Sequence, residues 1–375
     1  MGTELLTTKI TLPPLRNRTI VRRRLTKTAI DDIAPRLTVI SAPAGFGKTT
    51  TARLIVEAAD SATAWLTIGR EDNEPIRFFT YLVAAIQGAV PSFPERAGLA
   101  LESSSIRSLP SVLTMVINDL STYKRPVSVV IDDYHLLSSP EIDDGMTFLV
   151  SHAPTTLHFI IVTRRDPKLP LALLRARGEL REIRTRELRF TSEETAQLFQ
   201  TEDRYRLSPE ELETLQEHTE GWIAAIQMAG LSILRHGDPG TFLQSFGEVR
   251  RHIVDFLSQE VLLGQPEVVQ RFLIRSSVLS RLNGALCDAL ASTPEIDGTE
   301  TLEYLEQANL FVEAIDDEHR WFRFHPLFAA LLRRRLEGDI RQLHERAALW
   351  FIDQGLFEEA LPHAIDAESA HLIAE

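Results

Sequence analysis

The first half of the chain alternates short apolar runs with longer segments whose apolar positions recur at helical spacing. Residues 77–87 and 106–120 show the helical pattern. The apolar runs are rich in Val, Ile and Thr, which is typical of buried strands, and they cover residues 37–41, 64–67, 127–131 and 157–163. Strands that alternate with helices predict an α/β domain, a parallel sheet with flanking helices on both faces, over residues 36–190.

The pattern changes near residue 190, where strand-like runs stop and helical segments follow. Helix starts, in which a hydroxyl cap precedes acidic residues, occur at Thr191 and Ser208 and predict a small, all-α helical domain over residues 191–249. Further helices follow, and the alternating segments 310–315 and 321–324 predict a β-hairpin. Helices that end in a hairpin indicate a winged-helix domain over residues 250–338.

The two ends of the chain differ from these domains. Residues 1–35 are rich in Thr, Pro and Arg and predict an extended N-terminal arm. Residues 339–375 carry Trp350, Gly355 and Ala360 at the spacing of a tetratricopeptide helix pair. One such pair cannot bury its own apolar face, so we expect a truncated helical array, the first TPR-like helices of a longer one.

Composition and charge narrow the possible binding partners and the possible cellular compartment. Lys plus Arg number 40 and Asp plus Glu number 53, and the net charge of −13 argues against general attraction to nucleic acid or anionic lipid. Cys287 is the only cysteine, which excludes an intrachain disulfide and agrees with a reducing compartment. No signal-peptide pattern precedes the arm, and the longest uncharged stretch, residues 145–163, is too polar for a membrane helix. We therefore expect a cytoplasmic protein without membrane contact.

The candidate chemistry begins at residues 42–49, APAGFGKT, which match a phosphate-binding loop except that Ala42 replaces the first Gly. The backbone from Ala44 through Gly45, Phe46 and Gly47 to Lys48, Thr49 and Thr50 is expected to bind phosphate, with the following helix adding its positive end. Lys48 is expected to contact the β- and γ-phosphates, and the Thr49 hydroxyl to bind Mg²⁺. The alternative is an ordinary glycine-rich turn.

Two further strand ends carry charged residues. The run 127–131 ends in Asp132, which we assign to Mg²⁺, and Asp133, which we assign to the attacking water; we expect this strand to lie next to the strand of the phosphate loop. Arg164 follows the run 157–163 and is placed to sense a γ-phosphate. Residues 164–189 hold nine basic and four acidic side chains, which favours an ion-paired surface over a nucleic-acid patch.

At this point the chain resembles MalT-like activators of the LuxR family, bacterial transcription regulators among the signal-transduction ATPases with numerous domains (STAND). The motifs IVR, SAPAGFGKTT, VIDDYH, TR, GW and FHPLF carry the resemblance, in that order, at residues 20–22, 41–50, 130–135, 163–164, 221–222 and 324–328. The resemblance implies a P-loop NTPase domain, a helical domain and a winged helix, followed by a superhelical sensor for an inducer and a C-terminal helix-turn-helix that binds DNA, both outside this chain. Ala42 matches the family's own form of the loop.

The resemblance also implies roles for single residues. Val21 and Arg22 would lie near adenine and ribose, His325 would contact the β-phosphate of ADP, and the segment of Trp222 would face the nucleotide. Gly69 departs from the family pattern, which usually has an acid there. Glu71 or Asp72 would supply that acid, unless it is dispensable.

These inferences predict an ATP- and ADP-controlled switch with slow ATP hydrolysis, which resets a self-associating ATP state to a closed ADP-bound monomer. The alternative is a nucleotide-dependent scaffold without appreciable hydrolysis. A small-molecule kinase is disfavoured because no segment predicts a lid over an acceptor. DNA binding by the winged helix itself is disfavoured because the helices before the hairpin, residues 266–278 and 284–291, carry only Arg271 and Arg275 as basic groups.

Overall fold

The computed structural model of the chain describes residues 5–15, 19–26, 35–102, 108–199, 207–236, 251–291 and 296–374. The chain divides into two compact units, Met1–Thr201 and Glu202–Glu375. Each unit has its own core and is described by itself. The predicted boundary between residues 249 and 250 lies outside the described residues, as do parts of the predicted N-terminal arm.

The first unit is built on a five-stranded, all-parallel sheet in the order β2-β3-β4-β1-β5. Its strands are β1 (Leu37–Ser41), β2 (Ala62–Thr67), β3 (Val127–Asp132), β4 (Leu157–Thr163) and β5 (Leu180–Ile183). Four of them were predicted. The edge strand β5 was missed because its sequence, LREI, lies in the basic segment and lacks the apolar run of a buried strand.

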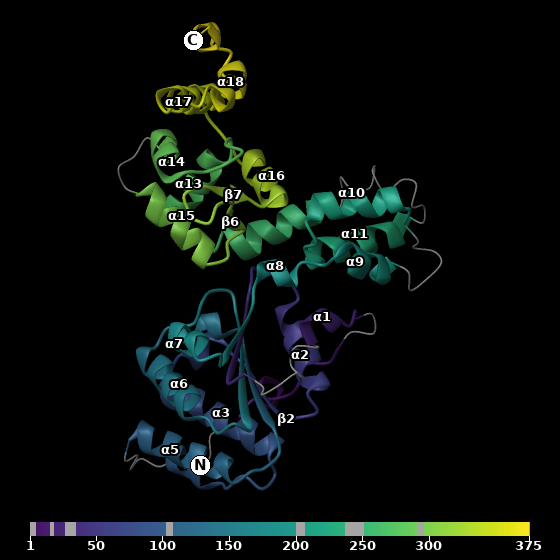
Figure 1. Cartoon of the computed structure of the whole chain (residues 1–375), viewed down its shortest axis with the longest axis vertical. Helices are drawn as coiled ribbons and strands as arrows, with labels where there is room; N and C mark the ends of the chain where they lie inside the picture. The colour runs from purple at the N-terminus through teal and green to yellow at the C-terminus, as the bar shows by residue number, and fades with distance from the viewer. Residues whose placement is uncertain are drawn as a thin grey trace. The chain divides into compact units, whose positions relative to one another are not determined.

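Helices cover both faces of this sheet, with α1 and α2 on one side and α3, α5 and α6 on the other (Figure 1). In chain order the helices are α1 (Arg23–Thr26), α2 (Lys48–Ala58), α3 (Pro75–Ala89), α4 (Arg96–Glu102), α5 (Leu109–Ser121), α6 (Pro140–His152), α7 (Leu171–Ala176), α8 (Thr185–Leu188) and α9 (Ser192–Phe199). Single 3-10 turns are η1 (Thr7–Lys9), η3 (Arg70–Asp72) and η4 (Tyr134–Leu136). The predicted α/β class is confirmed.

The central strands are buried because both faces of the sheet are covered. Val129, Ile160 and Ile161 are fully inaccessible, and Phe78 and Phe79 of α3 pack into one core with Val129 and Ile161. Burial of each such side chain contributes about 1.5–3 kcal/mol. The carboxyl ends of β1, β3 and β4 therefore extend from a closely packed core, and the candidate chemistry lies at those ends.

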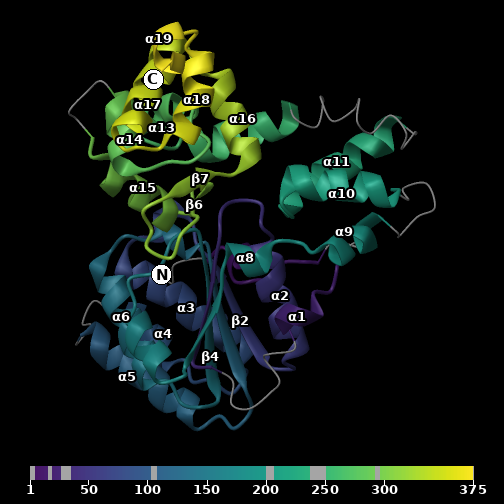
Figure 2. The ribbon, with the colours of Figure 1, turned by 45° about the horizontal axis from the view of Figure 1, so that its top comes forward.

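The second unit is mainly helical. Its helices are α10 (Pro209–Thr219), α11 (Ile223–His236), residues 251–257, the π-helical turn η7 (Ser258–Leu262), α13 (Glu267–Ser276), α14 (Gly284–Ala291), α15 (Gly298–Gln307) and α16 (Pro326–Arg334). The predicted cap at Ser208 is confirmed, since its hydroxyl accepts from the Glu211 amide at 3.2 Å. Helices α10 and α11 lie side by side in both views (Figures 1 and 2).

The predicted hairpin is also present. Strands β6 (Val312–Ala314) and β7 (Phe322–Phe324) pair antiparallel, and Leu282 joins them through a bridge to Phe322. Helix α16 begins directly after β7, so His325 is the cap of this helix. The hairpin and its helices share a core that includes Leu302, Leu305 and Phe328.

Three helices end the chain: α17 (Ile340–Asp353), α18 (Phe357–Asp366) and α19 (Ala370–Ala374). Helices α17 and α18 form an antiparallel pair of the kind expected for a tetratricopeptide unit. Phe357, Leu361 and Ile365 recur at every fourth residue of α18 and remain exposed. This stripe is an exposed apolar face of α18.

Candidate nucleotide site

The loop between β1 and α2 has the backbone of a phosphate-binding loop. Gly45 and Gly47 take positive φ angles of 78° and 74°, a region that side chains disfavour, and Gly47 caps α2. Two such glycines directly before a helix present backbone N–H groups to an anion. Ala42 is fully buried, so the residue in place of the first Gly packs in the core.

Lys48 is a buried cation at the start of α2. Its Nζ donates to the carbonyl oxygen of Pro43 at 2.8 Å, and only 9% of the residue is exposed. Burial and the nearby charge of Arg164 lower the pKa of Lys48 to about 8, although Asp133 and Asp132 partly offset this. A group with this balance is stabilised by an added negative charge, such as a phosphate.

Thr49 and Asp132 form the candidate metal site. The Thr49 hydroxyl donates to Asp132 Oδ1 at 3.2 Å, and Asp132 is buried. Burial and the neighbouring Asp133 raise the pKa of Asp132 to about 6. A hydroxyl and a carboxylate in contact fit the oxygen preference of Mg²⁺. Among the described residues, no group of three or more His, Cys, Asp or Glu lies together in a way that could hold a metal.

The predicted neighbourhood of the strands is wrong in one respect. We expected β3 to lie next to β1, but β4 lies between them and pairs with both. The predicted proximity of Thr49 and Asp132 still holds, because α2 packs across both β4 and β3 and so brings Thr49 within hydrogen-bond distance of Asp132. The insertion also brings the end of β4, and with it Arg164, between the phosphate loop and the acidic pair.

Arg164 accordingly lies close enough to Lys48 and His135 for its charge to lower the pKa of both. The neighbouring Arg165 makes structural contacts instead: its Nη2 donates to the carbonyl oxygens of His135 and Leu137, both at 3.2 Å. Arg165 therefore ties the end of β4 to the turn η4 that follows Asp133.

Asp133 begins that turn in a left-handed conformation, with φ of 59°. Its side chain is 42% exposed, and its Oδ1 lies 3.9 Å from Nδ1 of His135. Burial, reinforced by the charges of Arg164, Lys48 and Arg165, lowers the pKa of His135 to about 3. Asp133 is thus the accessible acid of the pair, and Asp132 the buried one.

The acids after β2 are already neutralised. Thr67 pairs with Asp132 in the sheet, so the segment of Gly69 lies beside the site. Asp72 is buried, accepts from the Gly69 amide at 2.7 Å and pairs with Lys9 and Arg77.

The Glu71 carboxylate also pairs with Lys9, and it fills the space that a Cβ on Gly69 would need. The Gly at position 69 is therefore what allows Glu71 to fold back beside β2. Both candidate substitutes for the family's acid are held in ion pairs.

The N-terminal arm packs against the helix of the phosphate loop, since α1 contacts α2. The Arg22 guanidinium is buried and donates to Glu194 Oε2 at 3.2 Å and to the Leu188 carbonyl oxygen at 2.8 Å. Burial lowers its pKa to about 10. Val21 is exposed. A contact of this arm with adenine or ribose would therefore use the Val21 side chain or the main chain of Arg22.

The basic segment is ion-paired, as predicted. Glu182 pairs with Arg175 at 2.8 Å and also with Arg184, which in turn pairs with Asp166. Arg175 and Arg184 of the basic segment are therefore held by acids of the same segment.

In the second unit, Trp222 and His325 belong to one aromatic cluster. The centroid of the Trp222 ring lies 5.1 Å from that of Phe311 and 5.9 Å from that of His325. His325 Nδ1 accepts from the Leu327 amide at 3.3 Å, so the proton is on Nε2, which donates to the Thr219 carbonyl oxygen at 3.2 Å. Both nitrogens are thus engaged within the unit, and the nucleotide contacts of Trp222 and His325 stay predictions.

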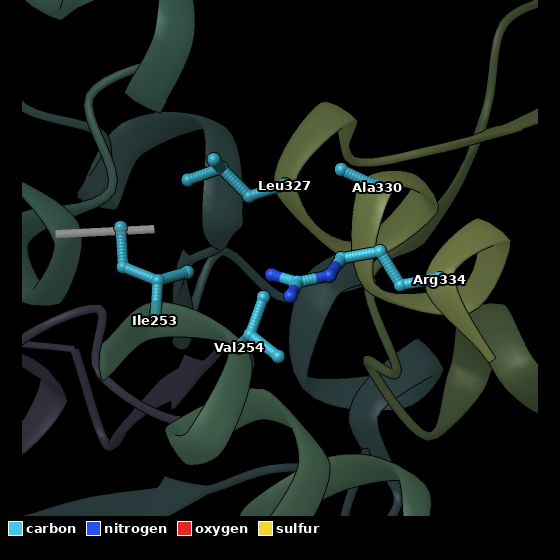
Figure 3. Close-up of a pocket in the computed structure, with 5 residues that line it drawn as sticks. All are labelled: Ile253, Val254, Leu327, Ala330 and Arg334. Atoms are coloured by element: carbon cyan, nitrogen blue, oxygen red, sulfur yellow. The ribbon is translucent and has the colours of Figure 1, made fainter. Parts of the chain in front are cut away.

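The second unit also contains a cavity of about 290 Å³, lined by Ile253, Val254, Leu327, Ala330 and Arg334. Figure 3 shows Leu327 and Ala330 on α16, and the Arg334 side chain extending toward Val254. The cavity contains none of the predicted site residues. It is an apolar recess with one cation at its edge.

Three participants at the phosphate end were not predicted from the sequence. They are the Pro43 carbonyl, the His135 ring and the Arg165 guanidinium. Only His135 carried a signal, its position two residues after Asp133 in a recognisable motif. The other two contacts depend on backbone geometry.

Comparison with known proteins gives relatives of the whole chain. Residues 258–347 match the MalT winged helix domain family. The HTH-type transcriptional regulator MalT of Cronobacter sakazakii is 33% identical over 381 residues, which cover 99% of this chain and 42% of that protein. MalT of Yersinia pestis is 34% identical over 382 residues, with 99% and 41% covered. The chain thus spans less than half the length of these relatives.

Among solved structures, the Walker-type ATPase of Pyrococcus abyssi superposes with a TM-score of 0.58. It is 17% identical and covers 86% of this chain and 98% of its own. This likeness shows the fold, and it agrees with the predicted parallel sheet with flanking helices. None of the helices described above is both long enough and apolar enough to cross a lipid bilayer.

Proposed function

The chain is MalT-like along almost its whole length, as its motifs predicted, and on that basis we propose that it is an adenine-nucleotide-controlled switch of a transcription regulator. ATP would favour an open state that self-associates, and ADP a closed monomer. One observation carries this proposal: the buried Lys48 lies beside a loop whose two glycines have positive φ angles. The Thr49 hydroxyl next to it is hydrogen-bonded to Asp132.

Nucleotide binding follows from these groups. The loop amides and Lys48 would hold the β- and γ-phosphates, while the exposed Val21 is available to the adenine. Thr49 and Asp132 would hold Mg²⁺, which neutralises phosphate charge when bound. Arg164 would contact the γ-phosphate, because its charge already acts on Lys48.

Slow hydrolysis is the proposed reset. Asp133 is the half-exposed carboxylate next to the buried Asp132, so it can orient a water on the open side of the phosphates. The acids after β2 are held by Lys9 and Arg77, which leaves Asp133 as the carboxylate available for this role in this part of the site. A single orienting acid is consistent with slow turnover.

The pairing of Glu71 and Asp72 with Lys9 also favours the second candidate, a nucleotide-dependent scaffold that does not hydrolyse ATP. The carboxylates of Glu71 and Asp72 already accept from Lys9, which makes them less available to a water. Phosphate release from wild type and from Asp133→Asn separates the two candidates. The switch predicts a loss of turnover of about 100-fold or more in the variant with ATP still bound, within the usual range for general-base catalysis. Equal release would favour the scaffold.

The switch also requires a difference between the two nucleotide states. We propose that His325 supplies it through the β-phosphate of ADP, since a ligand shifts a conformational equilibrium only by its differential affinity. An inducer, self-association and DNA binding would involve further domains like those of the longer relatives. Mass spectrometry of nucleotide released from the denatured protein tests the premise, with ADP expected and an empty protein contradicting it.

A further inference from the structure

The turn after Asp133 is held firmly in place. Arg165 donates to two of its carbonyl oxygens, and the buried Tyr134 donates its hydroxyl to Asp143 Oδ1 at 2.9 Å. The Leu136 amide donates to the Asp133 carbonyl oxygen at 3.0 Å. These contacts hold the backbone around His135 in place.

That ring carries an unsatisfied polar atom. Nδ1 of His135 is buried and makes no hydrogen bond to any residue that the structure describes. Oδ1 of Asp133 lies 3.9 Å from this nitrogen, which is too far for a hydrogen bond. Buried polar atoms are nearly always paired in folded proteins, so this nitrogen calls for a partner that the surrounding contacts do not supply.

The surroundings decide the charge of the ring. Lys48, Arg164 and Arg165 act on it as cations, and together with burial they hold its pKa far below neutrality. The imidazole is consequently neutral, with one nitrogen that donates and one that accepts. A carboxylate can only accept, so an approach of Asp133 selects the Nδ1–H tautomer.

We propose that His135 is a positioning residue for ATP hydrolysis, whose Nδ1–H donates to one oxygen of Asp133 and thereby directs the other oxygen at the attacking water. The proposal rests on the proposed hydrolytic function. The movement required is small, because the half-exposed Asp133 side chain needs to close a gap of 3.9 Å to an ordinary hydrogen-bond length. The fixed turn keeps the donor still while the carboxylate rotates.

The variants separate this role from simple packing. His135→Leu fills the space of the ring with an apolar side chain and removes the donor. It should lower kcat about 10- to 100-fold, which is less than the loss expected when Asp133 itself is replaced. His135→Asn places an amide N–H near the position of Nδ1 and should recover most of that turnover. The matched control is His152→Leu, at the exposed end of α6.

The test measures kcat, KM and ADP affinity of each variant, with thermal unfolding to verify the fold. We expect KM and ADP affinity to change less than about twofold, and His135→Leu to add no further loss in an Asp133→Asn background, because coupled residues are not additive. Equal kcat in wild type and His135→Leu, equal losses in the Leu and Asn variants, or additive losses with Asp133→Asn would each overturn the role of His135 alone. A wild-type protein that binds ATP but releases no phosphate would overturn the hydrolytic function and this role with it.

Discussion

Two regions of this chain carry predicted nucleotide contacts, and they differ in how well their polar groups are satisfied. At the carboxyl ends of β1, β3 and β4, Lys48 and Asp132 have strongly shifted pKa values and His135 has an unpaired nitrogen. Around Trp222, by contrast, His325 uses both nitrogens within the second unit. Buried groups with perturbed pKa values or an unpaired nitrogen indicate a ligand site, whereas a cluster whose polar atoms are paired is stable without a ligand.

The two regions also differ in the kind of evidence that supports a nucleotide contact. The phosphate end can be argued from charge, burial and hydrogen bonds of the chain itself. The role of His325 rests on the resemblance, because its own contacts are those of a helix cap and a buried core. Four predictions test the contrast, from the largest expected effect to the smallest.

Trp222→Ala should destabilise the second unit by about 3–5 kcal/mol, the usual cost of removing a large buried aromatic side chain. Trp222 is completely inaccessible and packs against Phe311. Chemical denaturation gives the free energy of unfolding. Leu231→Ala, at an exposed position of the nearby helix α11, is the control and should cost little. A change below about 1 kcal/mol for Trp222→Ala would remove the structural role assigned here.

Lys48→Ala should weaken ADP and ATP binding at least about 30-fold, because loss of one partner from a buried charge pair costs about 2–5 kcal/mol. Titration calorimetry on nucleotide-free protein measures the affinity. Lys124→Ala is the matched control, since Lys124 is exposed just before β3, at the opposite end of the sheet. Unchanged affinity in Lys48→Ala would contradict the phosphate assignment.

The stability of the nucleotide-free protein should depend on pH through Asp132. Its pKa rises from 3.8 to about 6 on folding, so between these values the folded state holds a proton that the unfolded state has lost. Stability from this group is complete below about pH 4 and is lost as the pH rises through 6, an effect of about 1–3 kcal/mol.

Asp132→Asn removes this titration, and the difference in unfolding free energy between wild type and variant from pH 4 to 7 isolates it. Bound Mg²⁺ and nucleotide should suppress the dependence in wild type. A pH-independent difference would show that the carboxylate is ionised in the empty site.

His325→Ala should weaken ADP about tenfold and ATP much less, if the proposed contact with the β-phosphate couples the two units; such couplings are typically about 1–3 kcal/mol. Competition between the two nucleotides measures the ratio directly. Equal weakening of both, together with lower stability, would assign His325 to the core alone.

Much of the fold could be predicted from the sequence because its signals are local. The apolar runs identified four of the five strands, and the caps at Thr191 and Ser208 identified helix starts. β5 escaped because an edge strand need not be apolar on both faces. The phosphate loop was recognisable because its glycines are required by a backbone shape within one short segment.

By itself the sequence determined which residue types were available: the loop glycines, Lys48, the acidic pair, Arg164 and the motifs shared with MalT-like proteins. Only the tertiary structure decided their relations. The insertion of β4 between β1 and β3, the capture of Glu71 and Asp72 by Lys9, and the unpaired nitrogen of His135 all depend on chain segments distant in sequence. Burial and charge shift a pKa through space, so no reading along the chain can assign them.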